Sequence, residues 1–188
     1  MKILSLMGSP RKRGNTAKVL GWVEEELAKG GHELERVVLS DYEIHGCLGC
    51  GTCQKNLEEP GCVQKDDTDS VLRKIIEADR VVYATPLYCW GFTSQMKTLI
   101  DRQYCLVKGY GTEDFRSLVE GKRTALLVTC AGPVEENADL IQKMFNRVNG
   151  YARCKVLCKY VIPFCTVPED LGPEQQEEAR KMAREILS

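Results

Sequence analysis

The sequence predicts an α/β fold in which a doubly wound, five-stranded parallel sheet lies between two layers of helices (α/β/α). Two observations carry this prediction. Short apolar runs alternate with helical patterns along all 188 residues, and no repeat or low-complexity linker interrupts them. Such alternation is typical of parallel sheets whose crossover connections are helices. We therefore expect one domain, residues 1–188, with a cysteine-rich loop inserted at about residues 45–65.

The expected strands and helices follow one another in order. The apolar runs predict strands at residues 2–8, 32–40, 80–86, 123–132 and 154–163. Apolar residues at helical spacing predict helices at 15–29, 66–79, 94–107 and 135–148, and a last helix that opens at Pro173. Gly30 and Gly31 end the first helix, and Asp66 and Asp67 are expected to cap the second.

Composition excludes several classes of protein. The 26 Lys and Arg against 27 Asp and Glu leave a net charge of −1, which argues against nucleic-acid binding driven by bulk charge and against a strongly acidic electron carrier. No apolar run reaches the roughly 20 residues of a membrane span, and the start is too short for a signal peptide. We therefore expect a cytoplasmic protein without a membrane partner, whose ten cysteines are free thiols or metal ligands rather than disulfides.

The turn after the first expected strand, "GSPRKRGNT" at residues 8–16, predicts an anion site. In doubly wound sheets the ligand lies beyond the carboxyl ends of the strands, where a helix N-terminus offers unpartnered N–H groups. Gly14 lets the backbone approach a phosphate closely, and Arg11 can donate a charge-assisted hydrogen bond. Neither a Walker A loop nor a G-x-G-x-x-G pattern is present. The alternative is a solvated basic turn that caps the helix.

The stretch "PLYCWGF" at residues 86–92 follows the third expected strand and combines aromatic side chains with flexible backbone. Such a surface suits a flat ring whose edge needs N–H donors. The alternative is that Tyr88, Trp90 and Phe92 pack beneath the next helix.

Four blocks resemble the flavodoxin-like NADPH-dependent FMN reductases, and within them the iron–sulfur flavoprotein branch. In chain order they are "GSPRKRGNT", "GCLGCGTCQKNLEEPGCVQKDD", "ATPLYCWGFTSQMKTLIDR" and "VTCAGP". The resemblance runs from about residue 1 to 150. It implies that the FMN phosphate contacts Ser9, Arg11, Arg13, Gly14, Asn15 and Thr16. It also implies that the isoalloxazine ring lies between Pro86, Leu87, Tyr88, Trp90 and Gly91 on one side and Thr129, Cys130, Ala131 and Gly132 on the other.

Four cysteines form the pattern C-x2-C-x2-C-x8-C: Cys47, Cys50, Cys53 and Cys62. Three thiols spaced two residues apart, with a fourth further on, can hold a [4Fe–4S] cluster. The last gap is about one residue longer than in the iron–sulfur branch. The alternatives are a thiol-bearing loop over the flavin or at a subunit contact, and a structural zinc site. The six other cysteines are expected to be buried small hydrophobes.

The resemblance implies an FMN-dependent NAD(P)H oxidoreductase that passes electrons to a second acceptor. That acceptor could be a quinone, a nitro or azo compound, free flavin, or ferredoxin. No side chain is assigned a catalytic role, because the flavin carries the chemistry. The alternatives are an electron-transfer flavoprotein without turnover and a thiol-based redox sensor. The resemblance also implies a homodimer or homotetramer.

Overall fold

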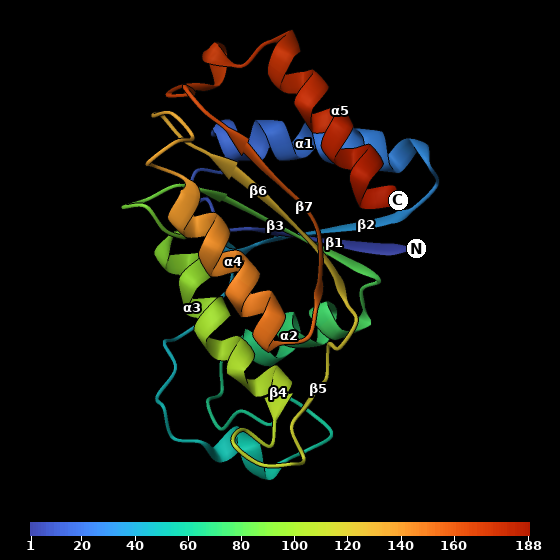
Figure 1. Ribbon diagram of the computed structural model, residues 1–188, viewed down its shortest axis with the longest axis vertical. Helices are drawn as coiled ribbons and strands as arrows, with labels where there is room; N and C mark the ends of the chain where they lie inside the picture. The colour runs from blue at the N-terminus through green and yellow to red at the C-terminus, as the bar shows by residue number, and fades with distance from the viewer.

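The sheet has the predicted parallel architecture (Figure 1). The computed structural model describes residues 1–188. Its five main strands are β1 (Lys2–Met7), β2 (Glu33–Val38), β3 (Arg80–Pro86), β6 (Arg123–Thr129) and β7 (Lys155–Ile162). They lie in the order β2-β1-β3-β6-β7, and every neighbouring pair is parallel. This is the flavodoxin-like strand order, so the predicted fold is confirmed, and the order reverses between β1 and β3.

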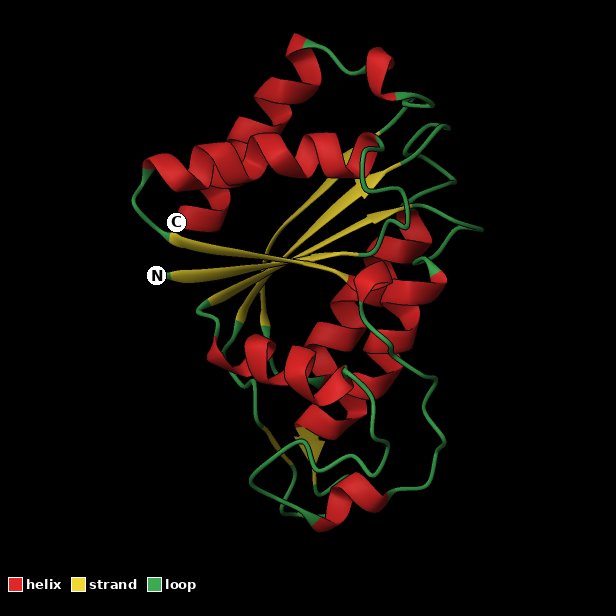
Figure 2. Ribbon diagram, turned by 180° about the vertical axis from the view of Figure 1, so that it is seen from behind, coloured by secondary structure: helices red, strands yellow, loops and turns green.

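Two layers of helices cover the sheet. Helices α1 (Asn15–Lys29) and α5 (Pro173–Leu187) lie on one face, and α2 (Thr68–Glu77), α3 (Ser94–Arg102) and α4 (Asp139–Tyr151) lie on the other (Figures 1 and 2). No helix combines the length and the apolar character needed to cross a bilayer.

The two cores follow from the alternation of side chains along each strand. In β1, Ile3 and Met7 contact the core beneath α1 and α5, whereas Leu4 and Leu6 contact the core beneath α2, α3 and α4. All four side chains are at most 1% exposed. A strand that is apolar on both faces is typical of the centre of a parallel sheet, and β1 lies between β2 and β3.

Helices α3 and α4 depart most from their predicted bounds, and α2 is shorter than predicted by two residues at each end. Helix α3 ends at Arg102, not at 107, because the chain tightens into a 3-10 turn (Gln103–Leu106). It then extends as β4 (Val107–Lys108), which pairs with β5 (Arg116–Ser117) in a small antiparallel ribbon that the sequence did not predict. Helix α4 begins at Asp139, not at 135, because Glu136 has φ of 54°, outside the right-handed helical region.

The strands are shorter than expected at several ends. β2 ends at Val38, where a 3-10 turn (Leu39–Asp41) begins, and β6 ends at Thr129 rather than at 132. Two further 3-10 turns, Thr52–Lys55 and Pro168–Asp170, lie in the loops that follow β2 and β7. Both loops line cavities, which the next section describes.

Candidate functional site

A cavity of about 620 Å³ lies at the carboxyl ends of β1, β3, β6 and β7. We call it the first-turn cleft, because the turn between β1 and α1 forms one wall. The structure brings most of the predicted flavin residues together on it: Ser9, Arg11, Arg13, Gly14, Asn15, Thr16, Pro86, Leu87, Tyr88, Thr129, Cys130 and Ala131. The cleft therefore stands at the point where the strand order reverses, as expected for a ligand site in this class of sheet.

The first turn offers unpartnered backbone donors. Gly14 is the N-cap of α1, and no side chain caps the helix. The N–H groups of Asn15, Thr16 and Ala17 make no hydrogen bond within the chain. A Cβ on Gly14 would come within 3.1 Å of the Arg11 Cβ, so a larger residue would crowd the turn. The turn thus presents the partial positive charge of a helix N-terminus to the cleft.

The charged residues of the cleft have one sign. Arg11 and Arg13 are exposed and form no ion pair with a carboxylate, although Lys12 beside them pairs with Asp41 at 2.5 Å. No Asp or Glu lines the cleft. Two free guanidinium groups beside unpartnered amides make the cleft suited to an anion with several acceptor oxygens.

Two polar side chains connect the first turn to the other walls. The Asn15 Nδ2 donates to the Cys165 carbonyl at 2.9 Å, while the Asn15 Oδ1 is buried and has no partner. The Thr16 and Thr129 hydroxyls lie 2.7 Å apart, with both residues at most 3% exposed. A buried acceptor without a donor costs free energy, so Asn15 Oδ1 is suited to a hydroxyl or N–H group of a ligand.

Three predicted residues, Trp90, Gly91 and Gly132, do not line the cleft. The Tyr88 and Gly91 backbones exchange two hydrogen bonds across a tight turn, in which Cys89 and Trp90 have φ of 47° and 59°. Left-handed backbone is rare for residues with a Cβ and is strained for a bulky one. The turn holds the Trp90 indole 60% exposed, outside the cleft.

Sequence reasoning missed one wall, which is formed by the loop after β7: Cys165, Thr166, Val167 and Pro168. Its backbone is fixed to the residue that follows β6, because the Cys165 N–H donates to the Cys130 carbonyl at 3.1 Å. The sequence offered one signal for this wall, which is its position in the predicted sheet. The loop follows the carboxyl end of a strand on the same edge of the sheet, where ligands of such sheets bind.

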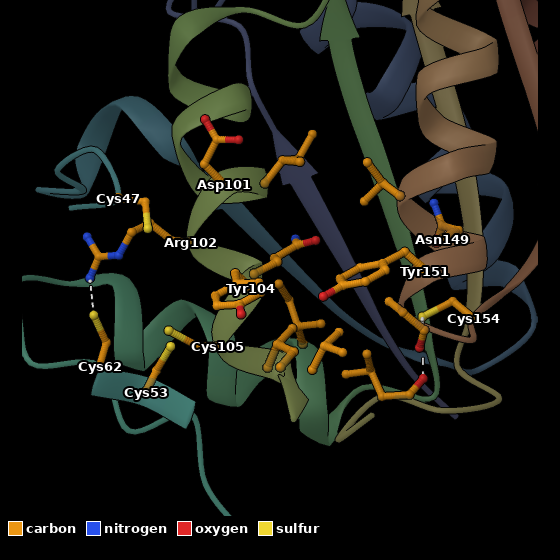
Figure 3. A pocket seen from close by; sticks show the side chains of 18 of the residues that line it. Cys47, Cys53, Cys62, Asp101, Arg102, Tyr104, Cys105, Asn149, Tyr151 and Cys154 are labelled. Carbon is orange, nitrogen blue, oxygen red and sulfur yellow. Dashed lines mark hydrogen bonds between the residues drawn. The ribbon is translucent and has the colours of Figure 1, made fainter. Parts of the chain in front are cut away.

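A second cavity, of about 920 Å³, lies between the sheet, α3, α4 and the cysteine loop (residues 45–65). We call it the thiol cavity. All four predicted ligands line it, together with Cys105 and Cys154. Figure 3 shows the sulfur atoms of Cys53, Cys62 and Cys105 gathered at one end, with Tyr104 and Tyr151 between them and Cys154. Cys47 and Cys50 are exposed, and no three cysteines, histidines or acids are gathered closely enough to hold a metal ion as they stand.

A buried ion pair fastens the cysteine loop to α3. Arg102 and Asp66 side chains are each 1% exposed, and the Arg102 Nη1 lies 2.7 Å from the Asp66 Oδ2. Arg102 also donates to the His45 carbonyl at 2.7 Å and to the Cys62 Sγ at 3.2 Å (Figure 3). Asp66 accepts the Thr68 N–H at 3.1 Å, so its predicted capping role is only part of its function. Its position beside Arg102 had no signal in the sequence.

The electrostatics of this pair follow from burial and hydrogen bonding. Burial raises the pKa of Asp66, but hydrogen bonds from Arg102, the His45 N–H and Thr68 outweigh it and hold that pKa well below its usual value. Burial lowers the pKa of Arg102, and its bonds to Asp66 and Cys62 reverse that effect. Both groups are therefore charged in the folded chain at neutral pH.

A second buried cation, Lys108, holds the middle of the cysteine loop. Lys108 is 0% exposed, and its Nζ donates to the Cys53 carbonyl at 2.9 Å and to the Pro60 carbonyl at 3.1 Å. It forms no ion pair with a carboxylate. Burial lowers the pKa of Lys108, and the Cys53 and Cys105 thiols oppose that effect. Gln54 adds a further bond from its Nε2 to the Val107 carbonyl at 2.8 Å.

The remaining cysteines mostly behave as small hydrophobes. Cys105, Cys130, Cys158 and Cys165 are buried, Cys154 is half-buried, and none of the ten cysteines forms a disulfide. Burial raises the pKa of Cys130 to about 11 and that of Cys158 to about 12, so both thiols are protonated and unreactive at neutral pH. The expectation is wrong for Cys89, which is exposed in the strained turn.

Comparisons with known proteins agree with this geometry. Residues 1–157 match the model of a family described as NADPH-dependent FMN reductase. An iron–sulfur flavoprotein of Archaeoglobus fulgidus is 36% identical over 188 residues, which cover 99% of this chain and 79% of the relative. An iron–sulfur flavoprotein of Methanocaldococcus jannaschii is 37% identical over 110 residues, and this match covers 58% of the chain and 55% of that protein.

Solved structures share the fold at low identity. An NAD(P)H:quinone oxidoreductase from Methanothermobacter marburgensis superposes with a TM-score of 0.74 at 20% identity, covering 98% of this chain and 94% of the other. An azoreductase from Bacillus anthracis has a TM-score of 0.74 at 18% identity, covering 97% and 98%. These likenesses support the flavodoxin-like fold.

Proposed function

Because the chain belongs to the NADPH-dependent FMN reductase family, and by sequence to its iron–sulfur flavoprotein branch, we propose that this oxidoreductase binds FMN in the first-turn cleft. In this proposal NAD(P)H reduces the flavin, and a second small-molecule acceptor or a ferredoxin removes the electrons. One observation carries the proposal. Three backbone amides without partners and the buried, unpartnered Asn15 Oδ1 lie together where the strand order of the sheet reverses.

The residues of the cleft fit the parts of FMN. The amides of Asn15, Thr16 and Ala17 and the free guanidinium groups of Arg11 and Arg13 would hold the phosphate. The Asn15 Oδ1 would accept a hydrogen bond from a ribityl hydroxyl. Leu87 and Tyr88 on one wall, with the loop after β7 on another, would shield the ring from water. Bound FMN supplies the electron-transfer chemistry, so the chain needs no acid or base of its own.

The test is spectroscopic. FMN added to the flavin-free chain should bind with one-to-one stoichiometry, and its fluorescence should be quenched on binding. Under anaerobic conditions NADPH or NADH should bleach the bound flavin, and a quinone or an azo dye should restore its colour. Bleaching without recovery would favour an electron carrier, and failure to bind FMN would overturn the proposal.

We propose that the cysteine loop holds an iron–sulfur cluster through Cys47, Cys50, Cys53 and Cys62. The four thiols line one cavity, and the buried Arg102 Nε beside them has no partner, so it is free to donate to an acceptor in that cavity. Four thiolates are the usual ligands of a [4Fe–4S] cluster, which would supply one-electron transfer. Iron and acid-labile sulfide assays after anaerobic reconstitution test this, with the Cys50→Ser variant expected to retain less iron than Cys154→Ser.

We also propose that copies of the chain associate around the mouth of the first-turn cleft. Large apolar side chains are exposed there or nearby in sequence, with Trp90 60%, Phe164 68% and Val167 47% exposed. Exposed apolar residues gathered at a site rim favour association. Sedimentation velocity should give a homodimer or larger assembly that Phe164→Lys weakens, whereas a monomer at every concentration would contradict the proposal.

A further inference from the structure

The buried charges that hold the cysteine loop do not balance. Arg102 has a carboxylate partner in Asp66, so this pair is neutral as a whole. Lys108 is equally buried but meets only the carbonyl oxygens of Cys53 and Pro60. An ammonium group has three donors, and here two are used. An uncompensated buried charge is costly, so one excess positive charge in this place requires an explanation.

The two carbonyls that Lys108 contacts belong to the cysteine loop. Cys53 is itself a predicted ligand, and Pro60 lies two residues before Cys62, the next predicted ligand. Lys108 is one of the two residues of β4. The other, Val107, accepts a hydrogen bond at its carbonyl from the Gln54 side chain of the cysteine loop. The ammonium group is therefore held within the loop by the main chain next to two of the thiols.

We propose that Lys108 is the buried counter-charge of an anionic group held by the cysteine loop, and that it raises the reduction potential of that group. This inference rests on the proposed cluster. An iron–sulfur cluster with four thiolate ligands carries a net negative charge, which grows by one on reduction, and local charge is one determinant of the potential of such clusters. A fixed cation nearby stabilises the reduced form more than the oxidised form. Lys108 would thus be a positioning residue, not a ligand.

The chain offers a matched control in Lys122. It lines the thiol cavity, and its Nζ, like that of Lys108, donates to main-chain carbonyls, those of Ile76 at 2.8 Å and of Ala78. Its ammonium group makes no hydrogen bond to the cysteine loop. Lys122→Gln therefore removes a comparable charge and a comparable pair of carbonyl contacts at a place away from the cysteine loop.

The experiment measures the midpoint potential of the reconstituted chain by redox titration followed by electron paramagnetic resonance. Lys108→Met removes the charge and the donors, Lys108→Gln keeps donors without the charge, and Lys108→Arg keeps both. We expect Lys108→Met and Lys108→Gln to make the midpoint potential more negative by at least about 59 mV. For one electron this shift is a tenfold change in the ratio of reduced to oxidised form. Lys108→Arg and Lys122→Gln should stay close to the wild type.

Each result decides between the proposals. A wild-type chain that takes up no iron or sulfide overturns the cluster and this inference together. A loaded wild type whose potential is unmoved in Lys108→Gln overturns the inference alone. If Lys108→Gln restores the wild-type potential that Lys108→Met loses, Lys108 acts only through its hydrogen bonds, which also overturns it. Circular dichroism of the cluster-free variants identifies any that fail to fold, and Lys108→Gln then remains the deciding variant.

Discussion

The first-turn cleft and the thiol cavity both have positively charged groups or hydrogen-bond donors beside them, but of different kinds. The cleft uses main-chain groups, the amides of the first turn of α1, which are fixed by a fifteen-residue helix and a central strand. At the thiol cavity, the buried side chains of Arg102 and Lys108 hold the cysteine loop, which has little regular structure. The comparison teaches that the cleft depends on backbone geometry, whereas the cavity depends on a few charged side chains. Replacing one of them should lower the free energy of unfolding.

The largest effect should come from breaking the ion pair of the thiol cavity. Arg102→Met leaves Asp66 buried and unpaired, and removing one partner of a buried pair typically costs about 3–5 kcal/mol of unfolding free energy. Urea unfolding of the cluster-free chain measures it. The double variant Arg102→Met with Asp66→Asn should recover part of the loss, and the surface control Lys143→Ala, which breaks an exposed pair with Asp139, should cost about 0.5 kcal/mol or less. A loss equal to that of the control would remove the distinction drawn here.

The next effect concerns the cleft. Asn15→Leu removes the unpartnered Oδ1 and the bond to Cys165, so we expect FMN to bind less tightly by about 1.5–3 kcal/mol, roughly 10- to 150-fold. Fluorescence titration measures the affinity. Asn137→Leu is the matched control, because Asn137 also donates to a carbonyl, that of Pro133 at 2.8 Å, but does not line the cleft. Equal affinities in the two variants would contradict the assignment.

Acid should weaken the buried ion pair beside the thiol cavity. The pKa of Asp66 is lowered in the folded chain, so its contribution to stability is complete above its unfolded value of about 4 and is lost as pH falls through the folded value. Below about pH 4 the contribution should decline by up to about 1.4 kcal/mol per pH unit. Urea midpoints of the wild type and Asp66→Asn, followed from pH 7 to 3, should converge as pH falls. Parallel curves would show that Asp66 titrates normally.

The smallest effect concerns the strained turn at the cleft rim. Trp90 is 60% exposed at φ of 59°, so Trp90→Gly relieves strain and loses little buried surface. Trp90→Ala removes the same indole but keeps the Cβ. We expect the glycine variant to be more stable than the alanine variant by roughly 0.5–1 kcal/mol, as thermal unfolding would show. The opposite order would mean that the turn is not strained in solution.

The sequence predicts the cleft better than the cavity, for physical reasons. Strand order and the first turn follow from local patterns, because the apolar alternation of β1 and the donors near Gly14 are contiguous in the chain. The partners of Arg102 and Lys108 lie 36 to 57 residues away, and most of them are carbonyls, which leave no mark on a sequence. Arginine and lysine in an unassigned segment are ordinarily read as solvated, so their burial could not be foreseen.

Helix α3 is anchored at both ends, and this fixes the spacing between the first turn and the cysteine loop. At its N-terminus the Thr93 hydroxyl donates to the Gly8 carbonyl at 2.7 Å, beside the first turn, and at its C-terminus Arg102 binds the cysteine loop. Nine residues of helix span about 14 Å. The length of this rigid spacer is therefore set by its two attachments, and a one-turn insertion into α3 would pull Arg102 from the cysteine loop or Thr93 from Gly8.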